Sequence, residues 1–230
     1  LGDYLFSRAF HLSCEFETNI ASRELSRTTN IMVAGELLQA KARDCFELTE
    51  ERYLEIIGMK TAELCAASAR LGAIFSGAQT RVSRAFYDYG YNLGLAFQII
   101  DDYLDILGEE SRVGKSLGTD LGLGRATLPV IRALSTVDAK DRRKILELLA
   151  RHSQETPADL KKMIISNGAA EYTLQKAKVL VDRLFRRSRP SRIRRTKNNF
   201  ANSPASSLPG IFRNPGGHSP DRGEEVRGYS

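Results

Sequence analysis

The chain has 230 residues, 42% of them hydrophobic, which is enough for one or two domains with a sizeable core. No apolar run reaches the ~18 residues that a membrane-spanning helix needs. The formal net charge of +6 gives no reason to expect that the folded part binds nucleic acid, because residues 183–230 hold eleven Lys and Arg against three Asp and Glu, whereas residues 1–182 hold 23 against 25.

Apolar residues recur three and four positions apart along most of the chain, which is the spacing of one helix face. Thr49 is expected to cap the helix that contains Tyr53. Since almost no segment alternates as a strand does, the sequence predicts an all-α fold, an antiparallel helix bundle. The expected helices are residues 1–21, 23–42, 53–75, 81–107, 126–134, 139–150 and 168–186, with a further one that begins at Thr156-Pro157-Ala158-Asp159.

Two segments depart from this pattern. Residues 108–124 are a glycine-rich loop that contains Lys115 and Asp120. Residues 188–230 are rich in Arg, Pro, Ser and Gly and cannot bury enough apolar area to offset the entropy of ordering, so we expect a helical domain at 1–187 and a disordered basic tail at 188–230. The three cysteines form no CxxC pair and the start has no signal-peptide pattern, which predicts a reducing, cytoplasmic location.

The most informative segment is FQIIDDYLD at residues 97–105. In a helix, one face would hold Gln98, Asp101, Asp102 and Asp105. A neighbouring apolar stripe, expected to face a core, would hold Leu93, Phe97, Ile100 and Leu104. Acids at this spacing repel by about 0.2–0.5 kcal/mol per pair, and a helix C-terminus disfavours them further. Mg²⁺ would relieve the repulsion, since it binds one or two carboxylates and completes its shell with waters and phosphate oxygens; a solvated acidic helix end is the alternative.

Basic side chains elsewhere extend this pattern to a site of mixed sign. Lys60 and Thr61 lie in an expected helix, and Lys115 follows a glycine in the loop. Each feature by itself is more often part of the surface. Together, acids that hold a metal and cations that hold phosphate are what diphosphate chemistry requires.

Several motifs then occur in a fixed order along the chain. They are GDYL at 2–5, GELLQ at 35–39, KTA at 60–62, GLAFQIIDDYLD at 94–105, GKSLGTDL at 114–121 and GRATLP at 124–129. In this order and rough spacing they resemble the trans-isoprenyl diphosphate synthase (polyprenyl synthetase) family, most of all its bacterial-type, medium- and long-chain members. The resemblance covers about residues 1–185, and FQIIDDYLD with its downstream Gly-Lys is its most specific part.

The resemblance implies a helix bundle around a central apolar cavity and a prenyltransferase activity. The reaction would be the Mg²⁺-dependent, head-to-tail condensation of isopentenyl diphosphate onto an allylic diphosphate. The metal, held by two aspartate-rich motifs, would draw diphosphate off the allylic substrate before the isopentenyl double bond attacks and a proton is lost. A homodimer through helix faces such as 81–97, and peripheral membrane contact for a long-chain product, are further implications, with no nucleic-acid partner.

The resemblance also implies residue roles. The metal would be bound by Asp101, Asp102 and Asp105, with Asp101 and Asp105 best placed by their spacing. The allylic diphosphate would be held by Lys60, Thr61, Gln98 and Lys115. Arg125 stands where the family usually has lysine, which keeps the charge and changes the geometry. Gln39 and Phe97 would line the substrate. The expected catalytic group is Asp101, Asp102, Lys60 and Lys115.

The chain also departs from the family pattern, because its sequence holds a single DDxxD. We therefore expect a chain truncated at the N-terminus, with the first aspartate-rich motif upstream of residue 1 and an aberrant end after residue 187. Little chain elongation is expected from these 230 residues alone. Two alternatives remain: a non-catalytic subunit of a heteromeric prenyl synthase, and a terpene cyclase-like protein, in which the Gly-Lys and Lys-Thr pairs would not be expected.

Overall fold

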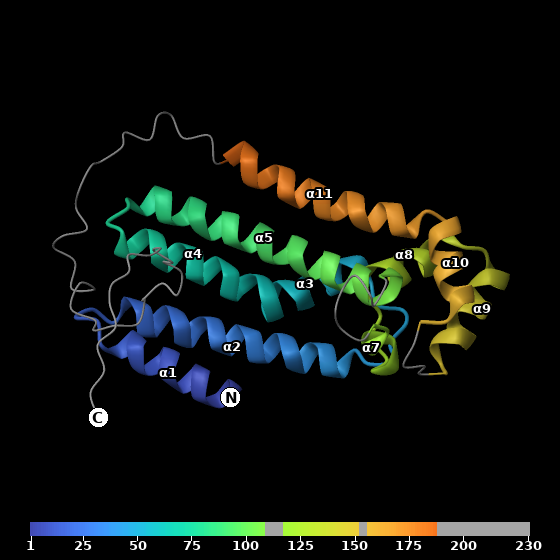
Figure 1. Cartoon of the computed structure of the whole chain (residues 1–230), viewed down its shortest axis with the longest axis horizontal. Helices are drawn as coiled ribbons and strands as arrows, with labels where there is room; N and C mark the ends of the chain where they lie inside the picture. Colours follow the sequence, from blue (N-terminus) through green and yellow to red (C-terminus); the bar gives the residue numbers. More distant parts are fainter. Residues whose placement is uncertain (109–116, 152–155, 188–230) are drawn as a thin grey trace, which may run out of the picture. The chain divides into compact units, whose positions relative to one another are not determined.

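The structure, a computed structural model, describes residues 1–108, 117–151 and 156–187, and of residues 185–187 the backbone only. Within these residues all regular secondary structure is helical, which confirms the all-α prediction (Figure 1). The expected tail at 188–230, and with it the domain boundary after residue 187, lies outside the described residues.

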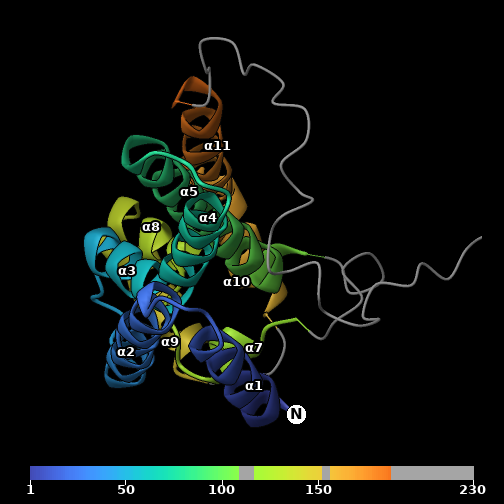
Figure 2. The ribbon, with the colours of Figure 1, turned by 90° about the vertical axis from the view of Figure 1, so that its left-hand side faces the viewer.

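Four helices lie side by side in the order α2, α4, α5 and α11, and α1 packs on α2 (Figures 1 and 2). The first helices along the chain are α1 (Gly2–Cys14), α2 (Ile20–Lys41), α3 (Glu50–Ile57), the π-helix η1 (Gly58–Ala62), α4 (Glu63–Phe75) and α5 (Thr80–Leu107). They are followed by α7 (Thr119–Gly122), α8 (Leu128–Thr136), α9 (Ala139–Leu149), α10 (Ala158–Ser166) and α11 (Ala169–Arg187).

Local chemistry accounts for several helix starts. The Thr49 hydroxyl accepts a hydrogen bond from the Arg52 backbone N–H at 3.2 Å, as predicted, and so satisfies one of the unpaired amides at the start of α3. The Asp138 carboxylate does the same for Asp141 at the start of α9, at 2.8 Å. Pro129 stands in the first turn of α8, where its missing N–H has no intrahelical partner to lose.

Three boundaries differ from the sequence prediction. The helix expected at 1–21 ends at Cys14, before a segment whose Thr18 and Asn19 are weak helix formers. The helix expected at 53–75 is interrupted by η1. The loop expected at 108–124 contains the short helix α7, since Asp105 provides hydrogen-bond acceptors for its first amides. The last two differences depend on contacts with other parts of the chain, which local propensity does not include.

Close helix approaches and two apolar clusters position α5. A Cβ atom added to Gly94 would lie 2.6 Å from the Ala62 Cα, so a side chain there would separate α5 from the η1–α4 segment. The first cluster joins α5 to α3, η1, α8 and α11, and the second joins the end of α5 to α8, α9 and α10. Burial of each large aliphatic side chain contributes about 1.5–3 kcal/mol. Because α5 takes part in both clusters, residues 98–105 are held at both ends of the segment.

In the described part of the chain, every helix is too short or too polar to cross a bilayer.

Candidate functional site

The acidic segment is helical, but the face that it buries differs from the prediction. Ile99 and Ile106 are fully buried, whereas Leu93 is 42% and Phe97 65% exposed. The prediction that Leu93 and Phe97 face a core is therefore wrong. Buried positions recur at 95, 99, 102 and 106, the spacing of one helix face, so Asp102 occupies a position with the pattern of a core residue. The proposed contact of Phe97 with substrate stays a prediction.

Asp102 is buried, and each of its two carboxylate oxygens accepts one hydrogen bond. Its Oδ2 accepts from the Tyr53 hydroxyl at 2.7 Å and its Oδ1 from the Gln98 amide at 2.8 Å. Burial raises the pKa of Asp102 to about 7, the charges of Asp120 and Asp101 act in the same direction, and the two hydrogen bonds act against it. The Tyr53 hydroxyl and the Gln98 amide thus offset part of the repulsion between neighbouring acids that the sequence predicted.

Asp105 is also buried, and both of its oxygens are engaged by the segment that begins α7. Oδ1 accepts from the Thr119 hydroxyl at 2.9 Å and from the Thr119 backbone N–H at 3.3 Å, and Oδ2 accepts from the Asp120 backbone N–H at 3.0 Å. These contacts are those of a capping carboxylate. Asp105 thus holds the start of α7, and the metal-binding role that its spacing suggested stays a prediction.

Lys60 and Thr61 point to different partners from consecutive positions of η1. The Lys60 ammonium donates to Gln39 Oε1 at 2.8 Å and pairs with Glu36 Oε1 at 3.3 Å, both on α2. The Thr61 hydroxyl donates to Gln98 Oε1 on α5 at 2.8 Å. The structure thus links the predicted residues Lys60, Gln39, Thr61 and Gln98 across three helices. Single π-helical turns such as η1 are frequent at functional sites.

A further acid and an arginine join the same region. Asp120 pairs with the Arg125 guanidinium at 3.1 Å. Burial raises the pKa of Asp120, the bond from Arg125 lowers it, the Asp105 charge raises it, and the Lys60 charge lowers it. Asp120 is therefore within electrostatic range of Asp102, Asp105, Arg125 and Lys60, and Asp102 is within range of Asp101. Within the described residues, Arg125 Nε is buried without a hydrogen-bond partner.

Sequence reasoning assigned no site role to Tyr53, Thr119 or Asp120. Asp120 stands in the GKSLGTDL motif, so the motif itself was the available signal. Tyr53 lies 49 residues from Asp102, and no local pattern marks that pairing. Lys115, predicted to bind diphosphate, lies outside the described residues.

The donor set sets a limit on metal binding. Across residues 1–108, 117–151 and 156–187, no three His, Cys, Asp or Glu side chains come close enough to hold a metal ion by themselves. Asp101 is partly exposed, whereas Asp102 and Asp105 are buried. Mg²⁺ is commonly bound by one or two carboxylates, with waters and substrate phosphate oxygens completing its shell.

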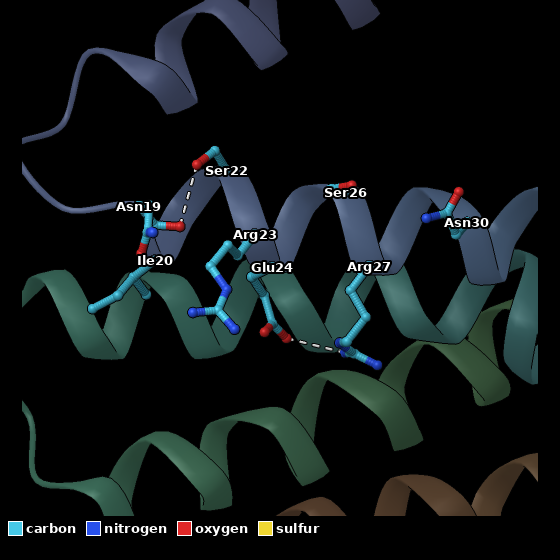
Figure 3. Close-up of a pocket in the computed structure, with 8 residues that line it drawn as sticks. All are labelled: Asn19, Ile20, Ser22, Arg23, Glu24, Ser26, Arg27 and Asn30. Atoms are coloured by element: carbon cyan, nitrogen blue, oxygen red, sulfur yellow. Dashed lines mark hydrogen bonds and ion pairs between the residues drawn. The ribbon is translucent and has the colours of Figure 1, made fainter.

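A second group of charged side chains lies on the first half of α2 and at the start of α4. The buried Glu63 accepts hydrogen bonds from the Tyr87 hydroxyl and, at 3.3 Å, from Arg27, which also pairs with Glu24 (Figure 3). Beside them is a cavity of about 750 Å³ lined by Asn19, Ile20, Ser22, Arg23, Glu24, Ser26, Arg27 and Asn30. All of its lining residues belong to the first turns of α2 and their N-cap, so it is a different feature from the central apolar cavity that the family resemblance implies, which stays a prediction.

The fold and the site together define a class of protein: a helical bundle whose helix α5 carries two buried acids, one of them hydrogen-bonded to the start of α7, where Asp120 pairs with Arg125. The sequence profile of the polyprenyl synthetase family matches residues 1–166, and the chain belongs to this family.

Individual relatives agree with the family match. A short chain isoprenyl diphosphate synthase of Methanothermobacter thermautotrophicus is 35% identical over 175 residues, which cover 74% of this chain and 54% of the relative. Heptaprenyl diphosphate synthase component 2 of Bacillus subtilis is 36% identical over a stretch that covers 76% of this chain and 52% of the relative. A polyprenyl synthase structure from Caulobacter crescentus, complexed with calcium and isoprenyl diphosphate, has a TM-score of 0.75 at 38% identity and covers 81% and 57%. The chain spans about half the length of the curated relatives it matches.

Proposed function

We propose that the chain carries the second aspartate-rich half of a polyprenyl diphosphate synthase site, which condenses isopentenyl diphosphate head-to-tail onto an allylic diphosphate. The observation that supports this proposal is a set of contacts that joins the acids of α5 to polar and cationic side chains: Asp102 binds Gln98 and, through it, Thr61, and Asp105 holds the segment where Asp120 pairs with Arg125. Membership of the family and the names of its relatives give the reaction class. In that reaction the allylic C–O bond breaks, a C–C bond forms to the isopentenyl carbon, and the diphosphate leaves while a proton is lost.

Mg²⁺ is the proposed metal, and the donor chemistry fits it. The available ligands are carboxylate oxygens, which suit a hard cation, and a calcium ion accompanies isoprenyl diphosphate in the Caulobacter structure. We assign Asp101, which is partly exposed, as the principal protein ligand, whereas Asp102 and Asp105 are buried. When bound, Mg²⁺ supplies positive charge that stabilises the leaving diphosphate.

The cationic residues would hold the diphosphate from the opposite side. Lys60 is fixed between Gln39 and Glu36, so its ammonium is oriented before substrate arrives. Arg125 offers a planar group able to bind two phosphate oxygens where a lysine would offer a point charge. Thr61 already donates its single hydroxyl proton to Gln98, so in this arrangement it offers lone pairs rather than a donor to phosphate. Lys115 stays in the proposed diphosphate set on the family resemblance alone.

Calorimetric titration of the 230-residue chain with inorganic diphosphate, with and without Mg²⁺, tests this proposal. We expect binding that needs Mg²⁺. We expect Asp101→Ala to weaken it by at least tenfold, because the variant loses the carboxylate that binds the metal. Asp182→Ala, which removes an exposed acid of α11, is the matched control for net charge. Binding that is indifferent to Mg²⁺ or to Asp101→Ala would sink the assignment.

A second candidate is one component of a heteromeric synthase. Two relatives are named heptaprenyl diphosphate synthase component 2, which favours this reading. It agrees with apolar side chains exposed on α5, such as Phe86, Leu93 and Phe97, within the face proposed for subunit contact. Native mass measurement of the chain, alone and mixed with a synthase subunit that carries a first aspartate-rich motif, separates a homodimer from a mixed complex. Elongation only in the mixture would favour the second candidate.

A further inference from the structure

Tyr53 on α3 is almost completely buried, and its hydroxyl hydrogen bond ends on an acid of the proposed site. The residue is 3% exposed, and the hydroxyl donates to Asp102 Oδ2 at 2.7 Å. The same carboxylate accepts from the Gln98 amide at its other oxygen. Tyr53 therefore reaches the site through Asp102, although it has no ligand-facing position of its own.

The chemistry of the three partners fixes the direction of each hydrogen bond. The Gln98 NH₂ group donates to Asp102 Oδ1, the direction that the ionised form of Asp102 requires because an ionised carboxylate only accepts. The amide oxygen then faces the other way and accepts the Thr61 hydroxyl proton at 2.8 Å. An amide that flipped would set an oxygen against an oxygen at Asp102. Asp102 thus determines how Gln98 and Thr61 are presented to the site.

We propose that Tyr53 is a positioning residue of the diphosphate site: its hydroxyl holds the Asp102 carboxylate, which orients Gln98 and, through it, Thr61. This inference rests on the proposed function, because that function defines the site that is positioned. The Gln98–Thr61 hydrogen bond also ties α5, which carries Asp101, to η1, which carries Lys60. A loosened Asp102 therefore disturbs the spacing between the metal side and the cationic side of the site.

Tyr53→Phe removes the hydroxyl and keeps the ring, and Tyr172→Phe is its matched control. Tyr172 also donates its hydroxyl to a carboxylate, Glu50 Oε2, at 2.6 Å, between α11 and α3. We expect Tyr53→Phe to weaken binding of magnesium diphosphate about tenfold, in the range found for residues that orient metal ligands, and Tyr172→Phe to leave it within twofold. In the ligand-free protein, Tyr53→Phe is expected to shift the ¹⁵N side-chain amide resonance of Gln98, and Tyr172→Phe is not.

A double-mutant cycle tests whether Tyr53 acts through Asp102. Asp102→Asn alone is expected to weaken binding about tenfold, and Tyr53→Phe added to it to change the affinity less than twofold. If the double variant instead shows the product of the two separate losses in affinity, the route through Asp102 is overturned. If Tyr53→Phe does not fold, Asp102→Asn decides alone, and unchanged affinity there overturns the proposal.

The outcomes separate this inference from the function on which it rests. A wild-type chain that binds no magnesium diphosphate overturns the proposed function and the positioning role with it. A wild-type chain that binds, together with a folded Tyr53→Phe that binds equally well and leaves the Gln98 resonance in place, overturns the positioning role alone.

Discussion

Replacement of Asp102 by Asn tests whether the buried acid controls how stability depends on pH. Burial raises the pKa of Asp102 from 3.8 to about 7. Because the folded-state pKa is the higher one, folding favours the protonated acid, and the stability from this group is present below pH 4 and is lost as the pH rises through 7. Between pH 5 and pH 7 the acid is already ionised in the unfolded chain. These 2 pH units, at about 1.36 kcal/mol each, lower the free energy of unfolding by about 3 kcal/mol.

Urea unfolding of the wild type and Asp102→Asn in metal-free buffer at pH 5, 6, 7 and 8, followed by circular dichroism, measures this loss. The wild type should lose about 3 kcal/mol relative to the variant between pH 5 and pH 8, since Asn has no proton to release. Asp182→Asn, at an exposed site, corrects for the change in net charge. A difference between wild type and Asp102→Asn that stays constant with pH would refute the claim that burial dominates at Asp102.

Two further substitutions test the anchoring of the acidic segment. Asp105→Ala removes three acceptor contacts to residues 119–120 and should lower the free energy of unfolding by about 2–4 kcal/mol in urea titrations; a loss below 0.5 kcal/mol would contradict the capping role. Gly94→Ala should lower it by about 1–3 kcal/mol because the new methyl group meets the Ala62 backbone, whereas Gly72→Ala, with no atom within 4 Å, should raise it by about 0.5–1 kcal/mol. If the melting temperatures of Gly94→Ala and Gly72→Ala shift in the same direction, this packing is contradicted.

Periodicity predicted most helices because apolar spacing follows directly from the face that each helix buries. It failed where a tertiary contact outweighs local preference. The interruption of the 53–75 helix at η1 coincides with a close approach of α2, since a Cβ at Gly35 would lie 2.8 Å from the Lys60 backbone nitrogen. Such an approach joins residues 25 positions apart, and no local pattern contains it.

The motifs predicted which residues share the candidate site but not which way each one faces. A shared helix face suggested that Gln98, Asp101, Asp102 and Asp105 all point at one ligand. The structure instead buries Asp102 and Asp105. Their partners, Tyr53 and the backbone of residues 119–120, come from other elements, so the division of roles among the acids depends on tertiary structure.

The central claim is that protein and diphosphate share the metal at Asp101. Electron paramagnetic resonance of Mn²⁺, used in place of Mg²⁺, tests it directly by titration of the wild type and Asp101→Asn with and without inorganic diphosphate. Since Mg²⁺ takes one or two carboxylates and completes its shell with waters and phosphate oxygens, Mn²⁺ in its place should be retained tightly only when both diphosphate and Asp101 are present. Retention of Mn²⁺ that is equally tight without diphosphate, or in Asp101→Asn, would contradict the claim.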